Sequence, residues 1–304
     1  MGTPDFAVAS LDALVNNNFE IAGVVTSPDR PAGRGRKIQE SAVKRYANEK
    51  DLTILQPSNL KSENFLEKLE ALKPDLQVVV AFRMLPEVVW SKPSLGTFNL
   101  HASLLPQYRG AAPINWAIIN GEKETGVTTF LIDKEIDTGK ILFREKTDIG
   151  KDETAGELHD RLMRTGAKLV LKTVKAIETG NIQYTEQDEL ARHETVLKKA
   201  PKIFREDCSI NWDNSVDNLH NFIRGLSPFP AAYTELPIGG KKEVVKIFSA
   251  CKTSNTYNAN PGEMASDGKS YLRIAAKDGW IELLELQRAG KRKMKIVEFL
   301  RGLS

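Results

Sequence analysis

An amide and an imidazole lie two positions apart in FNLHASLLPQYRGAAPINW, residues 98–116. Asn99 and His101 close the apolar run TFNLH, and Asp137 lies in the later turn KEIDTG. An Asn amide and a protonated imidazole can both donate hydrogen bonds to a developing oxyanion. A nearby carboxylate favours the charged form of the His and helps to move the proton that an attacking amine releases. The three residue types therefore suit acyl transfer, although a His at a strand end and an Asp in a turn can also be purely structural.

Such residues need a sheet to bring them together, and the first two-thirds of the chain predicts one. Short strand-like runs alternate with helical patterns, which is typical of a Rossmann-like, doubly wound, mostly parallel α/β sheet. Loops at the carboxyl ends of its strands form the ligand crevice, and Asn99 and His101 fall at such an end. The predicted strands are 20–26, 53–56, 76–82 and 97–101; the predicted helices are 6–17, 41–50, 62–73, 113–121 and 154–179.

The sequence changes character after about residue 180. A polar, weakly periodic stretch precedes several strand-like runs that are separated by Gly- and Asp-rich turns. We therefore predict a catalytic domain over 1–180, a linker over 181–200 and a small, mostly β domain, a barrel or a sandwich, over 201–304.

Composition excludes several other classes of protein. Of the 304 residues, 41% are hydrophobic and 27% charged, which is ordinary for a globular chain. No apolar run approaches the roughly 18 residues of a membrane span, so we expect a cytoplasmic protein without a membrane partner. The two cysteines, Cys208 and Cys251, have no metal-ligand spacing, and we expect no metal.

Two basic segments stand out although the net charge is only +3. They are SPDRPAGRGRK (27–37) and RAGKRKMKIVEFLRG (288–302). Either can be an ordinary solvated surface, or a surface that follows a polyanion such as a nucleic acid backbone.

Several motifs in one order and spacing resemble a known family. They are MGTPDFAV, VVTSPDRPAGRGRK, FNLHASLLPQYRGAAPINWAIINGE, TGVTTF and IDTG, followed in the second domain by IFREDCSINW and FIRGLSPFPAAYT. Together they resemble the methionyl-tRNA formyltransferase family, whose donor is 10-formyltetrahydrofolate. The AGRGRK loop and the basic β-rich tail distinguish this family from other formyltransferases.

The resemblance implies a reaction and a role for each matching residue. The α-amine of methionine on initiator tRNA would attack the formyl carbon on N10 of the folate. Asn99 and His101 would stabilise the oxyanion, while Asp137 would keep His101 charged and assist proton transfer. It also implies a monomer whose second domain is an OB-like barrel that holds the tRNA. The implied folate contacts are Ser103, Leu104, Leu105, Pro106, Arg83, Met84 and Leu85, with Thr128 near the site; the implied tRNA contacts are Arg34, Arg36, Lys37, Lys291, Arg292 and Lys293.

The sequence departs from the family pattern at two places. Many members of the family have a Gly-containing segment where this chain has AFRMLP, residues 81–86. We therefore expect the pocket for the pterin ring of the folate to have a different wall here. The chain also opens at the turn MGTPDFAV, without the strand that a doubly wound sheet places before it. Loss of a central strand leaves neighbouring strands unpaired and a core slot empty, and we expect the natural start to lie upstream.

Other functions remain open from the residues alone. The same chemistry could act on a nucleotide-linked amino sugar or a purine precursor, or use water as a formyl-folate hydrolase. A catalytically inactive RNA-binding relative is a third class, because fold alone does not give function. A nicotinamide dehydrogenase is disfavoured, since GTPDFA is not the GxGxxG fingerprint.

Overall fold

A computed structural model describes residues 1–32, 37–192, 196–253 and 259–303 of the chain. The chain divides into two compact units, which are described separately. Unit 1 comprises residues 1–110, 126–147 and 159–198, and unit 2 comprises 111–125, 148–158 and 199–304.

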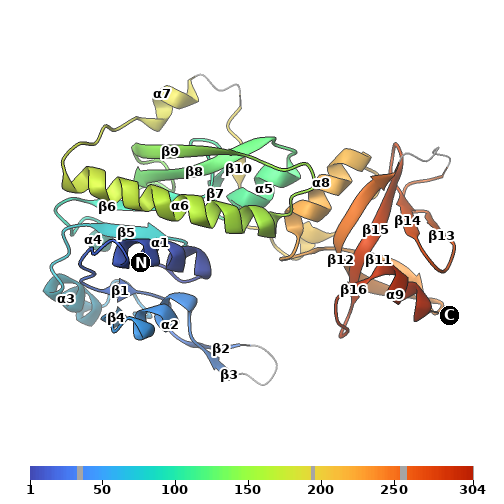
Figure 1. The fold of residues 1–304 in the computed structure, drawn as a ribbon, viewed down its shortest axis with the longest axis horizontal. Helices are drawn as coiled ribbons and strands as arrows, with labels where there is room; N and C mark the ends of the chain where they lie inside the picture. Colours follow the sequence, from blue (N-terminus) through green and yellow to red (C-terminus); the bar gives the residue numbers. More distant parts are fainter. Residues whose placement is uncertain (33–36, 193–195, 254–258, 304) are drawn as a thin grey trace. The chain divides into compact units, whose positions relative to one another are not determined.

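The strands of unit 1 agree with the predicted α/β sheet. Four strands lie in the order β5-β6-β8-β9, where β5 (Gln77–Val80) and β6 (Thr97–His101) are parallel. β6 pairs antiparallel with β8 (Glu124–Leu131), whose neighbour is β9 (Ile141–Asp148). β1 (Val24–Val25) and β4 (Ile54–Leu55) form a separate parallel pair. β6, which carries Asn99 and His101, is therefore paired on both sides (Figure 1).

The helices of unit 1 pack against its strands: α2 lies on β1 and β4, and α1 on β5. α2 begins where the Ser41 side chain accepts a hydrogen bond from the Lys44 N–H, which caps the first turn. The long α6 approaches β6 closely at Gly166, where a Cβ atom would lie 2.7 Å from Leu100 Cδ2. The helices are α1 (Asp5–Val15), α2 (Ala42–Glu49), α3 (Glu63–Ala71), α4 (Glu87–Trp90), α6 (Ala155–Glu178) and α7 (Gln187–Ala191).

The first two residues lie between the two groups of strands. The Gly2 N–H donates to Val25 O at 3.0 Å, and the Val80 N–H donates to Met1 O at 2.9 Å. The terminal ammonium donates to Val78 O at 2.6 Å, and burial lowers its pKa to about 5. A cavity of about 500 Å³ adjoins them, lined by residues of α1, β1, α3, β5 and α6. Met1 and Gly2 thus link β1 to β5 through main-chain hydrogen bonds.

The basic loop of residues 27–37 has a structure that the sequence did not predict. β2 (Arg30–Ala32) and β3 (Lys37–Gln39) pair antiparallel. Arg34 and Arg36 themselves lie outside the described residues.

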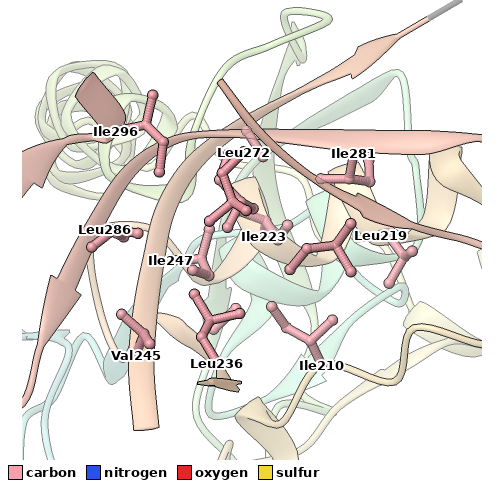
Figure 2. Packing of buried hydrophobic residues seen from close by; sticks show 14 of the residues in the cluster. Ile210, Leu219, Ile223, Leu236, Val245, Ile247, Leu272, Ile281, Leu286 and Ile296 are labelled. Atoms are coloured by element: carbon pink, nitrogen blue, oxygen red, sulfur yellow. The ribbon is translucent and has the colours of Figure 1, made fainter. Parts of the chain in front are cut away.

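Unit 2 is built on a curled antiparallel sheet, consistent with an OB-like domain. Its strands run in the order β11-β12-β15-β14-β13, and β16 pairs with β15. Isoleucines and leucines of α8 (Val216–Leu226) and of the strands meet in one core, which includes Leu219, Ile247 and Ile281 (Figure 2). The remaining bounds are α5 (Pro113–Ile119), β10 (Lys199–Ala200), the 3-10 helix η1 (Glu206–Cys208), β11 (Ala232–Ile238), β12 (Lys241–Thr253), β13 (Met264–Ser266), β14 (Leu272–Ala275), β15 (Trp280–Arg288), β16 (Met294–Lys295) and α9 (Ile296–Arg301).

Only part of the basic segment 288–302 lies on the surface of unit 2. Its second half is α9, whose Ile296, Phe299 and Leu300 are buried in the unit 2 core. Across the described ranges, no helix is long and apolar enough to cross a membrane.

Candidate active site

His101 is held at the end of β6, with only 7% of its surface exposed. Its Nε2 lies 2.9 Å from Tyr108 O, so this nitrogen carries a hydrogen and donates it to the carbonyl. Its Nδ1 faces the Asp137 carboxylate, with Oδ2 at 3.9 Å. The edge of the ring packs against Phe130, with centroids 6.5 Å apart. The imidazole is thus fixed in orientation, with one nitrogen directed to a carboxylate.

Asp137 reaches this position through an unusual backbone conformation. Its φ of +57° lies in the left-handed region, which Asp tolerates better than most residues do. Its Oδ2 accepts a hydrogen bond from the Gly110 N–H at 3.0 Å. The sequence prediction that Asp137 folds back to the strand end is therefore matched by the geometry.

Asn99 lies two residues before His101 on the same strand, so both side chains lie on one face of the sheet. Among the described residues, its buried Oδ1 has no hydrogen-bond partner. A buried polar atom of this kind normally has a partner, so this amide oxygen is available to accept a hydrogen bond from a ligand, while the Nδ2–H₂ of the same side chain is the group that can donate.

The loop after β6, where folate contacts are predicted, is held together from within. The Ser103 hydroxyl donates to Gln107 O at 2.6 Å. Thr128, opposite His101 on β8, donates to Ser103 O at 2.6 Å and accepts from the Leu105 N–H at 3.1 Å. Leu105, joined to Pro106 by a cis peptide bond, is fully buried with Phe130. The Leu105 side chain therefore belongs to the core, and only the backbone of this residue can face a ligand.

The altered segment after β5 contains residues in three different environments. Arg83 donates to the carbonyl oxygens of Ser58 and Pro57, and its pKa is lowered by burial and by Arg30. Met84 is 75% exposed, whereas Leu85 is buried. Met84 is thus the side chain here that remains accessible to a ligand.

The predicted tRNA-binding cations of unit 2 are partly neutralised. Arg292 pairs with Glu298 at 2.8 Å and Lys293 with Glu285 at 2.5 Å. The neighbouring Lys291 is exposed. In unit 1, the side chain of Lys37, like Arg34 and Arg36, is outside the described part of the structure.

The sequence does not single out Gln187 and its partner Arg109, which hold the site together. Gln187, at the start of α7, is 2% exposed in a segment that was predicted to be a linker. Its Oε1 accepts from Arg109 Nε at 3.0 Å and Nη2 at 2.7 Å, while its Nε2 donates to Asp137 O and Gly139 O, each at 2.9 Å. A polar segment of weak periodicity gave no signal for such a buried amide.

No group of three or more His, Cys, Asp and Glu side chains is placed to hold a metal ion, as far as the described residues go. The groups that the structure brings together are an amide and an imidazole on β6 and a carboxylate from the turn at Asp137. This set of groups can stabilise an oxyanion and transfer a proton, which is the chemistry of an acyl-transferring enzyme.

Comparison with known proteins identifies the class of transferase. Residues 1–174 match the formyl transferase family and residues 202–304 match the formyl transferase C-terminal domain, so the chain belongs to the formyl transferases. Its curated relatives include methionyl-tRNA formyltransferases. The one from Azobacteroides pseudotrichonymphae is 54% identical over 99% of this chain and 94% of its own, and the one from Bacteroides fragilis is 52% identical over 99% and 93%.

Solved structures show the same fold in more distant proteins. The sugar 3N-formyl transferase WlaRD is 22% identical, with a TM-score of 0.66 over 96% of this chain and 97% of its own. At this identity the likeness bears on the fold alone.

Proposed function

We propose that the protein transfers the formyl group of 10-formyltetrahydrofolate to the α-amine of methionyl initiator tRNA, for translation initiation. The observation that carries the proposal is the 52–54% identity, over 99% of the chain, to methionyl-tRNA formyltransferases. The Asn, His and Asp groups at the end of β6 supply the chemistry. We place the reaction in the cytoplasm and expect a monomer to perform it.

In this mechanism the methionine amine attacks the formyl carbon on N10 of the folate. The carbonyl oxygen becomes an oxyanion, which accepts hydrogen bonds from the Asn99 amide and from the His101 imidazolium. Nε2–H is held by Tyr108 O, so the oxyanion would accept from Nδ1–H; this nitrogen faces Asp137 but lies 3.9 Å from Oδ2, beyond hydrogen-bond distance. Asp137 stabilises the imidazolium and takes up the proton of the attacking amine. As the bond between the formyl carbon and N10 breaks, Asp137 passes this proton on to N10, the leaving group.

We assign the folate to the loop of Ser103, Leu104, Leu105 and Pro106, where Leu105 can contribute only its main chain, and to the segment of Arg83, Met84 and Leu85, where Met84 has the exposed side chain. Thr128 would act there by fixing the loop through its two hydrogen bonds. Arg34, Arg36 and Lys37 of segment 27–37, with Lys291, Arg292 and Lys293 of unit 2, are assigned to the tRNA backbone.

A formyl-transfer assay with labelled 10-formyltetrahydrofolate tests the proposal. The purified protein is offered methionyl initiator tRNA, a nucleotide-linked amino sugar, or no acceptor. We expect the label in formylmethionyl-tRNA. Label in the sugar would instead indicate a small-amine acceptor, and release as formate without any acceptor would indicate a hydrolase; either result would overturn the proposal.

A further inference from the structure

Gln187 joins two parts of the active site that are far apart in the sequence. On one side its Oε1 accepts both hydrogen bonds from Arg109, the residue before Gly110. On the other side its Nε2 donates to the main-chain oxygens of Asp137 and Gly139. Every donor of this amide is used, and the side chain is 2% exposed.

The backbone that Gln187 holds determines where the Asp137 carboxylate lies. Asp137 adopts a left-handed conformation, which persists only when its surroundings enforce it. The two carbonyl groups that accept from Gln187 lie on this residue and two residues later. The Asp137 carboxylate in turn accepts from Gly110, beside the arginine that Gln187 also binds.

α7 itself is anchored independently of this amide. Thr185 and Ile141 exchange main-chain hydrogen bonds of 3.0 and 2.8 Å. Leu190 packs against the buried cluster of Leu105, Phe130 and Ile141. We therefore expect a substitution of Gln187 to leave α7 in place and to change only the hydrogen bonds that this side chain makes with Arg109, Asp137 and Gly139.

We infer that Gln187 is a positioning residue for formyl transfer, which sets the Asp137 carboxylate against His101 by holding the main chain on both sides of the site. The inference rests on the proposed function for its kinetic readout. Gln187 does not touch the reacting atoms and acts through Asp137.

Two variants, Gln187→Glu and Gln187→Met, keep the size of the buried side chain but change its hydrogen bonds. They therefore test whether the hydrogen bonds, rather than the packing of the side chain, position Asp137. Glu keeps the shape and the acceptor for Arg109, but places a carboxylate oxygen against two carbonyl oxygens. Met keeps the shape and removes all four hydrogen bonds. A matched control is Glu189→Gln on the same helix, where the side chain is exposed.

For both variants we expect kcat with methionyl-tRNA to fall by about 10- to 100-fold, as small misplacements of catalytic groups do. The KM values for tRNA and folate should change little, and Glu189→Gln should match the unsubstituted protein. A kcat close to that of the unsubstituted protein in both variants, or a loss confined to KM, would overturn the inference.

Crystal structures of the same variants supply a readout that does not depend on the acceptor. We expect Asp137 Oδ2 to move away from Gly110 N, from its present 3.0 Å. An unchanged distance would refute the positioning role even if the protein proved not to formylate tRNA, whereas that failure alone would refute only the proposed function.

Discussion

At the scale of single residues, the charge of Asp137 can be separated from its shape. Asparagine tolerates the left-handed backbone almost as well as aspartate, and its oxygen can still accept from the Gly110 N–H. We therefore expect Asp137→Asn to leave the urea midpoint nearly unchanged and to lower kcat by on the order of 10²-fold, because the imidazolium loses its counter-charge. Equal kcat values in the two proteins would show that this carboxylate serves only the fold.

Thr128 is the residue whose hydroxyl links the proposed folate loop to the sheet. Thr128→Val keeps the shape but leaves Ser103 O and the Leu105 N–H without this partner in a buried place. We expect the free energy of unfolding to fall by about 1–3 kcal/mol, and the KM for the folate donor to rise. Thr128→Ser, which keeps the hydroxyl, is the control; if it behaves like Val, the hydrogen bonds are not the cause.

At the scale of elements, the buried amine of Met1 makes stability depend on pH in a chain that starts at this residue. Burial lowers the pKa of the Met1 amine to about 5, whereas in the unfolded chain it titrates near 8.0. Between these values the unfolded chain binds more protons, so stability falls as the pH drops from 8 to 5. Urea unfolding of a chain that starts at Met1, measured across this window, checks the prediction.

Two tails placed ahead of Met1 provide the control. Both a polar and an apolar extension, each of about five residues, move the charged amine out of the sheet and should remove this part of the pH dependence. Only the apolar tail can also fill the cavity of about 500 Å³, and it should raise the midpoint of thermal unfolding above that of the polar tail. Identical pH profiles with and without a tail would contradict this account of the buried amine.

Some elements can be predicted from a local sequence pattern, whereas the role of other residues depends on contacts that are distant in the sequence. The strand 97–101 was predicted with its bounds because a short apolar run with β-branched and aromatic residues is a local signal. The sequence does not predict α9. Ile296, Phe299 and Leu300 have helical spacing, but the cations around them are equally typical of a solvated surface. Gln187 could not be found, because its importance depends on hydrogen bonds to Arg109 and Asp137, 78 and 50 residues away.

At the scale of the whole molecule, binding of a tRNA should release counterions. We expect the logarithm of KM for tRNA to rise linearly with the logarithm of salt concentration, while the KM for folate changes far less. Arg34→Ala should reduce this slope by about 0.9, the value for one lost phosphate contact to a duplex. Arg45→Ala removes the same charge from the exposed face of α2 and should leave the slope unchanged; equal effects of the two would mean that net charge alone guides the tRNA.

The most direct test of the central claim is the single-turnover rate of formyl transfer to methionyl initiator tRNA at saturating substrates, for His101→Ala beside His159→Ala. His159 lies on α6 and pairs with Asp160 at 3.0 Å, outside the proposed site. We expect a rate reduced by about 10²–10³-fold for His101→Ala and an unchanged rate for His159→Ala. An unchanged rate for His101→Ala would contradict the assignment of the chemistry to the end of β6.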